Sequence, residues 1–177
     1  MSNYVSLMAQ SIGPYLRVNW KRFSNKPGGK WLFSRIIGFT VPYTGSIAAN
    51  VVLLEPGHGI VTLKEHRKVS NHLQSVHAIA LSNLAEMVTG LTLLNSLPDN
   101  TRGILTSIHI QYHKKARGVL AAECVCEIPV NNEEREINIS SEIKDEADEV
   151  VASATATWRI GPEKKARKEN LKSKEQQ

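Results

Sequence analysis

One carboxylate in an otherwise uncharged, apolar stretch is the residue best placed to do chemistry. Between Lys68 and Asp99 the only formally charged side chain is Glu86. It lies within residues 75–94 (SVHAIALSNLAEMVTGLTLL), which are apolar almost all the way round a helix, as in a buried helix. Burial is costly for an unpaired carboxylate and raises its pKa toward the range useful for acid–base catalysis. Glu86 is therefore a candidate site residue; the alternatives are a Glu at a helix boundary or one paired with a distant arginine.

Polar neighbours of Glu86 could support such a role. Residues three or four positions apart share a helix face, so Ser82, Asn83 and Thr89 are expected near Glu86. Asn83 or Thr89 could hydrogen-bond the carboxylate. The alternative is that these groups only make their own burial tolerable.

The charge distribution limits the classes of partner. The 177-residue chain is 41% hydrophobic and 22% charged, which predicts one globular domain with a real core. Residues 1–54 hold six Lys and Arg and no acid, residues 55–162 hold ten against fourteen acids, and residues 163–177 hold six against three. Nucleic-acid binding would be better supported by basic residues interleaved with aromatics, and only 6% of the residues are aromatic. We therefore expect no nucleic-acid partner.

The remaining composition favours an intracellular protein without metal or cofactor. Cys124 and Cys126 lie on one face of a predicted strand and fit a reduced core, and the six scattered His make no zinc spacing. We expect no membrane span, since the uncharged residues 36–54 contain glycines and a proline. The acid-free, basic N-terminus is compatible with a mitochondrial transit segment or with an ordinary helix of the domain. The sequence is therefore compatible with a location in the cytoplasm or in the mitochondrion.

Patterning divides the chain into a helical extension, a single domain and a charged tail. These are residues 1–30, 31–162 and 163–177. A helix is expected over 4–23, a helix or strand over 31–39, a loop over 42–46 and a long helix over 75–95. Strands are expected over 47–54, 60–66, 103–113, 119–129, 136–143 and 150–160, the first two joined by a hairpin turn at 55–59. One long apolar helix needs a curved antiparallel sheet around it, which is an α+β architecture.

Two motifs and the order of these elements carry a resemblance to a known superfamily. The first motif is an Asn or Gln, then His-Gly-Gly, then an acidic residue, and Asn71, His77 and Glu86 have the same spacing. The second motif is Tyr-x-x-Pro-Ala-Arg-x-Gly, to which residues 112–118 (YHKKARG) are similar. Over residues 30–160 the chain resembles the hotdog-fold acyl-CoA thioesterases of the phenylacetate-pathway and 4-hydroxybenzoyl-CoA type. Residues 42–78 also resemble a less-studied branch of that superfamily. Here His-Ala-Ile replaces His-Gly-Gly, and Lys115 stands where the family often has proline.

The resemblance implies hydrolysis of acyl-CoA thioesters. Glu86 would activate water or attack directly, while the backbone N–H of Ala78 would polarise the thioester carbonyl at the helix N-terminus. Asn71 would orient the water or Glu86, and His77 would position the start of the helix or the thioester sulfur.

The same resemblance assigns the second motif to coenzyme A. Its residues would contact the phosphates of coenzyme A; they are Lys114, Lys115, Arg117 and Gly118. The alternative is a solvated basic loop.

Helix geometry then predicts an assembly. His77 and Glu86 are nine residues apart, about half a turn out of alignment, so they point to opposite sides of one helix. A two-fold axis can bring them together from two chains, and we expect a homodimer or a dimer of dimers. Two alternatives remain: a hydratase or dehydratase on the same fold, and a non-catalytic acyl-binding dimer in which bulky Ile79 narrows the site.

Overall fold

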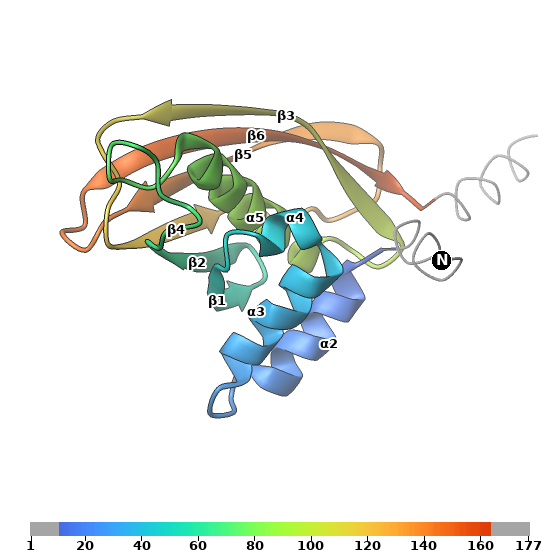
Figure 1. Ribbon diagram of the computed structural model, residues 1–177. Coiled ribbons are helices and arrows are strands. Elements are labelled where there is room, and N and C mark those ends of the chain that lie inside the picture. Colours follow the sequence, from blue (N-terminus) through green and yellow to red (C-terminus); the bar gives the residue numbers. More distant parts are fainter. Residues whose placement is uncertain (1–10, 164–177) are drawn as a thin grey trace, which may run out of the picture.

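A curved antiparallel sheet wraps around one central helix in the computed structural model, which describes residues 11–163 (Figure 1). The six strands follow the order β1-β2-β4-β5-β6-β3. The central helix is α5 (Ala78–Ser96). The strands are β1 (Asn50–Glu55), β2 (His58–Lys64), β3 (Thr101–Tyr112), β4 (Val119–Val125), β5 (Arg135–Lys144) and β6 (Val150–Pro162). This is the predicted α+β architecture; residues 4–10 of the first predicted helix and 164–177 of the tail lie outside the described residues.

The predicted hairpin turn is confirmed between β1 and β2. Glu55 pairs with His58 across Pro56 and Gly57. Gly57 has φ +76°, and a Cβ there would lie 2.8 Å from the carbonyl oxygen of Cys126. Glycine is needed for both the backbone conformation and this close approach.

Strand alternation places small and branched side chains against the helix. On β6, the alternating residues Ala152, Ala154, Ala156 and Trp158 form the inward face and are all buried. On β4, Leu120, Ala122 and Cys124 face the core, and both cysteines are free thiols. The alanines bring the sheet close to α5, which explains how a sheet can cover so much of one helix.

Helix α5 is the core of the molecule. It is long and apolar enough to cross a membrane by composition, but most of its residues are buried inside the fold, as in the core helix of a globular protein. Its buried hydroxyls are satisfied within the helix. Thr89, Thr92 and Ser96 each donate to the carbonyl four residues earlier, at 2.9, 2.7 and 2.6 Å.

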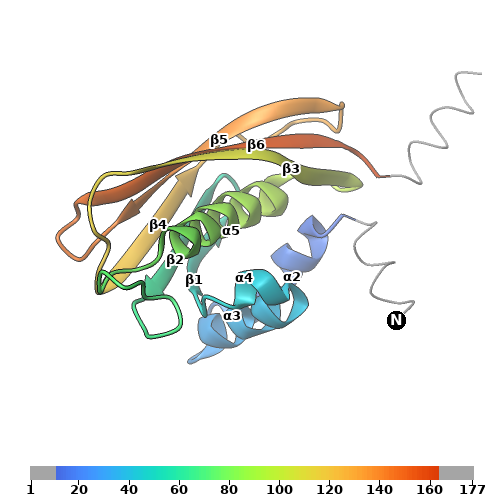
Figure 2. The same ribbon diagram turned by 45° about the horizontal axis from the view of Figure 1, so that its top comes forward.

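The N-terminal part forms a helical layer against α5 and β1 (Figures 1 and 2). It comprises α2 (Gly13–Phe23), α3 (Gly29–Thr40) and α4 (Pro42–Gly45). Of the two alternatives for residues 31–39, the structure shows the helix. The prediction of a loop over 42–46 was wrong, because a short helix lies there. The short helix α4 begins at Pro42, where a residue without an N–H is tolerated.

One arginine ties this layer to the end of the central helix. Arg17 Nη1 donates to the carbonyl oxygens of Asn95 and Leu97 at 2.9 and 3.1 Å, and Nη2 pairs with Asp99 at 2.5 Å. Nearby, Leu16 and Phe33 are fully buried, and Trp20 meets Phe33 edge to face at 5.2 Å. Arg17 thus satisfies the last carbonyls of α5 and fixes α2 across them.

Candidate active site

The sheet leaves one stripe of α5 partly open, and Glu86 lies on it. From residue 80 to residue 93 only Ser82 and Glu86 are not fully buried. With Ile79, which is 55% exposed, they recur at intervals of three and four and therefore share a face. The sequence-based prediction of a Glu within a buried helix is confirmed, and the side chain lies on the partly exposed face of that helix.

Glu86 borders an apolar cavity between the central helix and the N-terminal layer. The cavity measures about 90 Å³, and Glu86 is the only charged side chain among the described residues that line it. Ile37 of α3, Leu16 of α2 and Trp158 of β6 contribute to its walls. In residues 11–163 the Glu86 carboxylate has no hydrogen-bond or ion-pair partner. Burial therefore raises the pKa of Glu86 above its ordinary value.

Neither predicted helper residue is bonded to this carboxylate. Thr89 Oγ1 donates to the carbonyl oxygens of Ala85 and Glu86, at 2.9 and 3.1 Å. Asn83 Nδ2 donates to the carbonyl oxygen of Tyr43 at 3.0 Å. The Oδ1 atom of Asn83 is buried and has no partner among the described residues. In this state both side chains serve the packing of α5 and α4.

Among residues 11–163, the backbone N–H at the start of α5 has no hydrogen-bond acceptor, and it lies beside an exposed histidine. His77 is the N-cap, and its Nδ1 accepts from the N–H of Ile79 at 3.1 Å. The N–H of Ala78 occupies the first helical position, where a helix has no acceptor of its own. It is thus available to a ligand carbonyl, and the positive end of the helix dipole favours negative charge there.

Tyr112 is a residue of this site to which the sequence analysis gave no role. Its hydroxyl donates to the carbonyl oxygen of Ala78 at 3.1 Å and lies 2.9 Å from Ser82 Oγ. The last residue of β3 is therefore tied to the first turn of α5. The sequence motif around Tyr112 was recognised, but its contact with Ala78, 34 residues away in the same chain, depends on the sheet register, which no local pattern predicts.

Asn71 shapes the loop before α5. Its Oδ1 accepts from the N–H of Leu73 at 2.8 Å and from both the N–H and the hydroxyl of Ser75, at 3.3 and 3.2 Å. This Asx-type loop leads into residue 77, whose N–H donates to the carbonyl oxygen of Val69 at 2.7 Å. Asn71, His77 and Ala78 are therefore gathered at the N-terminal end of α5.

Glu86 is not part of that group within one chain. It lies nine residues along α5, about 13.5 Å down the axis and half a turn away from His77. One chain thus holds two separate features, a helix start with a free N–H and a desolvated carboxylate.

The basic connection between β3 and β4 lies against the helix start. Val76 N–H donates to the carbonyl oxygen of Ala116 at 2.8 Å, and Arg117 Nε donates to the carbonyl oxygen of Gln74 at 2.9 Å. The N–H of Gly118, which has φ +71°, donates to Glu65 Oε2 at 2.9 Å. These contacts place Arg117 beside the loop that leads into α5 and Gly118 beside Glu65, which follows β2.

The two lysines of that connection, Lys114 and Lys115, differ in their ion pairing. Lys114 Nζ pairs with Asp145 at 2.7 Å and also with Glu149, and these carboxylates raise the pKa of Lys114. Lys115 is exposed and has no ion-pair partner in the part of the chain that the structure describes. Lys115 and Arg117 are therefore freer to meet a phosphate than Lys114 is.

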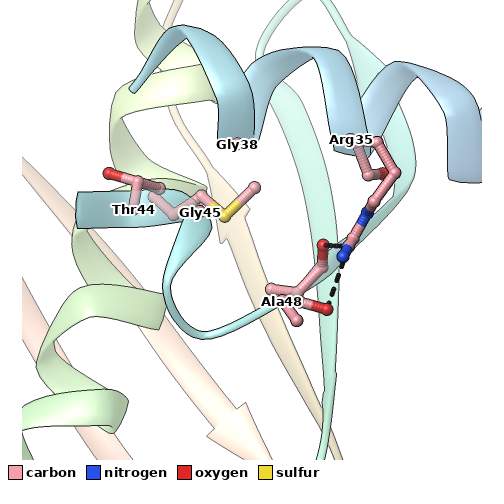
Figure 3. A pocket seen from close by; sticks show the side chains of 8 residues that line it. Arg35, Gly38, Thr44, Gly45 and Ala48 are labelled. Atoms are coloured by element: carbon pink, nitrogen blue, oxygen red, sulfur yellow. Dashed lines mark hydrogen bonds between the residues drawn. The ribbon is translucent and has the colours of Figure 1, made fainter. Parts of the chain in front are cut away.

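A second cavity of about 90 Å³ lies between α3, α4, the residues before β1 and α5 (Figure 3). Arg35 closes one side by donating to the carbonyl oxygens of Ala48 and Ala49 at 3.0 and 2.7 Å. Met87 lines both this cavity and the one beside Glu86. None of the predicted site residues lines this second cavity, which we do not assign to the site.

The curved six-stranded sheet around one central helix is the hotdog fold, as the resemblance implied. Residues 29–160 match the family described as Domain of unknown function (DUF4442). The match covers most of the chain, so the protein belongs to this family. No functionally curated protein matches the sequence.

Solved structures share the architecture. A structural-genomics target superposes with a TM-score of 0.69 and 29% identity, over 88% of this chain and 99% of its own. A Pseudomonas aeruginosa protein of unknown function, described as a probable thioesterase, has a TM-score of 0.66 and 20% identity, over 73% and 93%. A Streptococcus mutans protein bound to acetyl-CoA has a TM-score of 0.55 and 22% identity, over 64% and 88%. At the lower identities these comparisons establish the fold alone.

Proposed function

We propose that this protein hydrolyses acyl-CoA thioesters at sites shared between two copies of the chain. The observation that carries the proposal is Glu86, an unpartnered carboxylate with a raised pKa at an apolar cavity on the open stripe of the core helix. A carboxylate in this setting is suited to accept a proton near neutral pH. Similarity to a probable thioesterase and to an acetyl-CoA-bound protein supports the choice of substrate class.

The residues support a hydrolytic sequence in which each group has one task. The thioester carbonyl would lie at the start of α5 and accept a hydrogen bond from the N–H of Ala78. Glu86 of the other chain would take a proton from water as the water oxygen bonds to the carbonyl carbon. Collapse of the tetrahedral intermediate breaks the C–S bond, and the proton passes from Glu86 to the departing sulfur. The products are a carboxylic acid and free coenzyme A.

Direct attack by Glu86 is a variant of the same proposal. The carboxylate would then form an anhydride with the acyl group, and water would cleave it in a second step. After a single turnover in ¹⁸O-labelled water, an unlabelled product would identify the anhydride route with water attacking the Glu86 carbonyl carbon, because general-base hydrolysis always puts the label in the product.

A dimer is proposed because the chain carries two open, self-complementary features. Strand β3 lies at the edge of the sheet, and an unpaired edge favours pairing with another strand. The stripe of α5 formed by Ile79, Ser82 and Glu86 is also only partly covered. A two-fold axis that pairs β3 with its copy would face the two stripes toward each other and could unite each Glu86 with the partner helix start.

The proposal is tested by acyl-CoA hydrolysis over short, long and aromatic acyl groups, with Glu86→Gln as the variant. Exposed Glu127→Gln serves as a matched control, and light scattering records the oligomeric state. We expect Glu86→Gln to lose turnover while remaining a dimer. Hydrolysis by a protein that stays monomeric at micromolar concentration would contradict the shared site.

A non-catalytic acyl-CoA-binding dimer is the second candidate, and Ile79 is the observation that favours it. Its 55% exposed side chain follows Ala78, whose N–H is the proposed oxyanion donor, and a misplaced donor costs on the order of 10²–10³ in rate. Retention of acyl-CoA without product would support this candidate. Formation of an enoyl product or of its hydration product would instead indicate a hydratase or dehydratase.

A further inference from the structure

The helical hairpin formed by α2 and α3 projects from the body of the fold (Figure 1). Residues 24–28 join the two helices at its far end, away from the sheet. The buried sides of the hairpin are used by the fold, since α2 packs on α5 and α3 packs on β1. Its far end is therefore free to meet another surface.

Positive charge at this end has no carboxylate to balance it. Residues 1–54 contain six Lys and Arg and no acid. Three of the six have roles in the fold: Arg17 bonds the end of α5, Arg35 bonds the carbonyls of residues 48 and 49, and Lys30 donates to the carbonyl of Val52 at 2.8 Å. The other three are exposed and form no ion pair within residues 11–163. They are Lys21, Arg22 and Lys26.

Local electrostatics explains only part of this cluster. Lys21 and Arg22 occupy the last turn of α2, where they oppose the negative end of the helix dipole. Lys26 belongs to the connecting loop and stabilises no helix end in this way. The cluster therefore contains more positive charge than is needed to stabilise the end of α2.

A large apolar side chain is exposed next to these cations. Trp31, in the first turn of α3, is 60% exposed, and Leu32 beside it is 42% exposed. The protein's other tryptophans are sheltered: Trp158 is 4% exposed and Trp20 packs on Phe33. Tryptophan next to lysine and arginine is characteristic of helices that settle into the headgroup region of a bilayer.

We propose that this end of the hairpin, the tip patch (Lys21, Arg22, Lys26, Trp31 and Leu32), docks the protein on the surface of an anionic membrane. The cations meet anionic headgroups and the two apolar side chains enter the boundary with the acyl chains. A nucleic acid fits less well, because single-strand binding uses a basic groove with several stacking aromatics and the tip offers one indole at a projecting end. The docking is independent of catalysis and requires no chain segment to span the bilayer.

The test measures binding to vesicles of phosphatidylcholine with and without phosphatidylserine, by flotation at low and high salt. Binding is expected only with phosphatidylserine and should weaken with salt, because exposed charges are screened. The charge-reversal variant Lys21→Glu/Arg22→Glu/Lys26→Glu is expected to weaken binding by on the order of 100-fold or more. Its matched control makes the same change in net charge on the β2 side of the molecule and should bind within a few-fold of wild type: Lys64→Glu/Arg67→Glu/Lys68→Glu.

Tryptophan fluorescence tests which surface enters the lipid. Brominated phosphatidylcholine should quench the wild-type protein, and Trp31→Phe should remove the quenching while vesicle binding persists. Trp31→Ala should weaken binding by roughly tenfold, through lost apolar burial.

Three results would overturn the proposal. They are equal binding by the two charge-reversal variants, quenching that survives Trp31→Phe, and tighter binding to duplex DNA than to the vesicles with no effect of Trp31→Ala. Because Glu86→Gln should bind vesicles like wild type, failure of docking and failure of the proposed hydrolysis are separable. Melting curves verify that every variant remains folded.

Discussion

Replacement of Glu86 by Gln should make the protein more stable and less active at the same time. The two side chains have the same shape, but Gln carries no charge to desolvate. Burial raises the pKa of Glu86 in the folded protein above its unfolded value near 4.5. The folded state therefore holds this proton more tightly than the unfolded state does. Wild-type stability should fall as pH rises from about 4.5 through the folded pKa and then level off.

The size of the stability gain follows from the difference between the folded and unfolded pKa of Glu86. Each unit of pKa elevation removes about 1.4 kcal/mol from the wild type at high pH. Partial solvent exposure of Glu86 keeps the effect below that of a fully buried carboxylate. For a chain of this size a gain of 1 kcal/mol raises Tm by about 2–4 °C. The difference in Tm between Glu86→Gln and wild type should be near zero below pH 4.5 and grow with pH.

The activity of the same variant should fall steeply. Loss of a general base typically costs 10²–10⁴ in rate, or about 2.7–5.4 kcal/mol of transition-state stabilisation. The wild-type rate should itself decline as pH falls through the folded pKa of Glu86, since the protonated carboxyl cannot accept a proton. The Michaelis constant should change little, because the carboxylate contributes to the reaction more than to binding.

The assay combines melting curves across pH with acyl-CoA hydrolysis, and Glu127→Gln provides the exposed control. A difference in Tm that is equal at acidic and alkaline pH would refute a desolvated Glu86 in solution. Lower stability of Glu86→Gln at alkaline pH would show that the carboxylate has a partner across the dimer. Unchanged turnover would refute the catalytic role.

Three further substitutions test other parts of the site. Tyr112→Phe removes the hydroxyl that binds the carbonyl of Ala78 and should cost about 1 kcal/mol in urea unfolding and lower kcat; an unchanged kcat would limit the hydroxyl to a structural role. Gly90→Ala would place a Cβ 3.0 Å from the Trp158 ring and should destabilise by about 1–3 kcal/mol in thermal melts, and a neutral result would show that the ring can move. Arg117→Glu should raise KM for acyl-CoA in a salt-dependent manner with kcat largely intact, whereas loss of kcat at constant KM would contradict a phosphate contact.

Much of the fold could be predicted from local patterns because its signals are strong. The long apolar run of residues 75–94 identified the core helix, and Pro56 with Gly57 identified the hairpin. Residues 42–46 were mispredicted because proline, glycine and small polar residues indicate a loop, whereas contacts with α3 and α5 stabilise one turn of helix. Distant packing outweighed local propensity there.

The sequence predicted which residues belong to the candidate site, but only part of their arrangement in space. An isolated charge in residues 69–98 suffices to single out Glu86. The sequence could not show that the side-chain oxygen of Asn71 accepts hydrogen bonds within its own loop. These bonds depend on the conformation of residues 71–75. The approach of Tyr112 and of Arg117 to the start of α5 depends on sheet register. Such long-range contacts leave little trace in a single sequence.

The bond between Arg17 and the carbonyls of residues 95 and 97 also has a consequence for the order of events during synthesis. These partners are 78 and 80 residues apart in the chain. At roughly 5–20 residues per second, the ribosome needs about 4–16 seconds to add the residues that α2 must dock on. Throughout that interval α2 can pack on α3, but the side that meets α5, including Leu16, lacks its final partner. A growing chain of this protein therefore offers chaperones the apolar side of α2 that the finished molecule covers with α5.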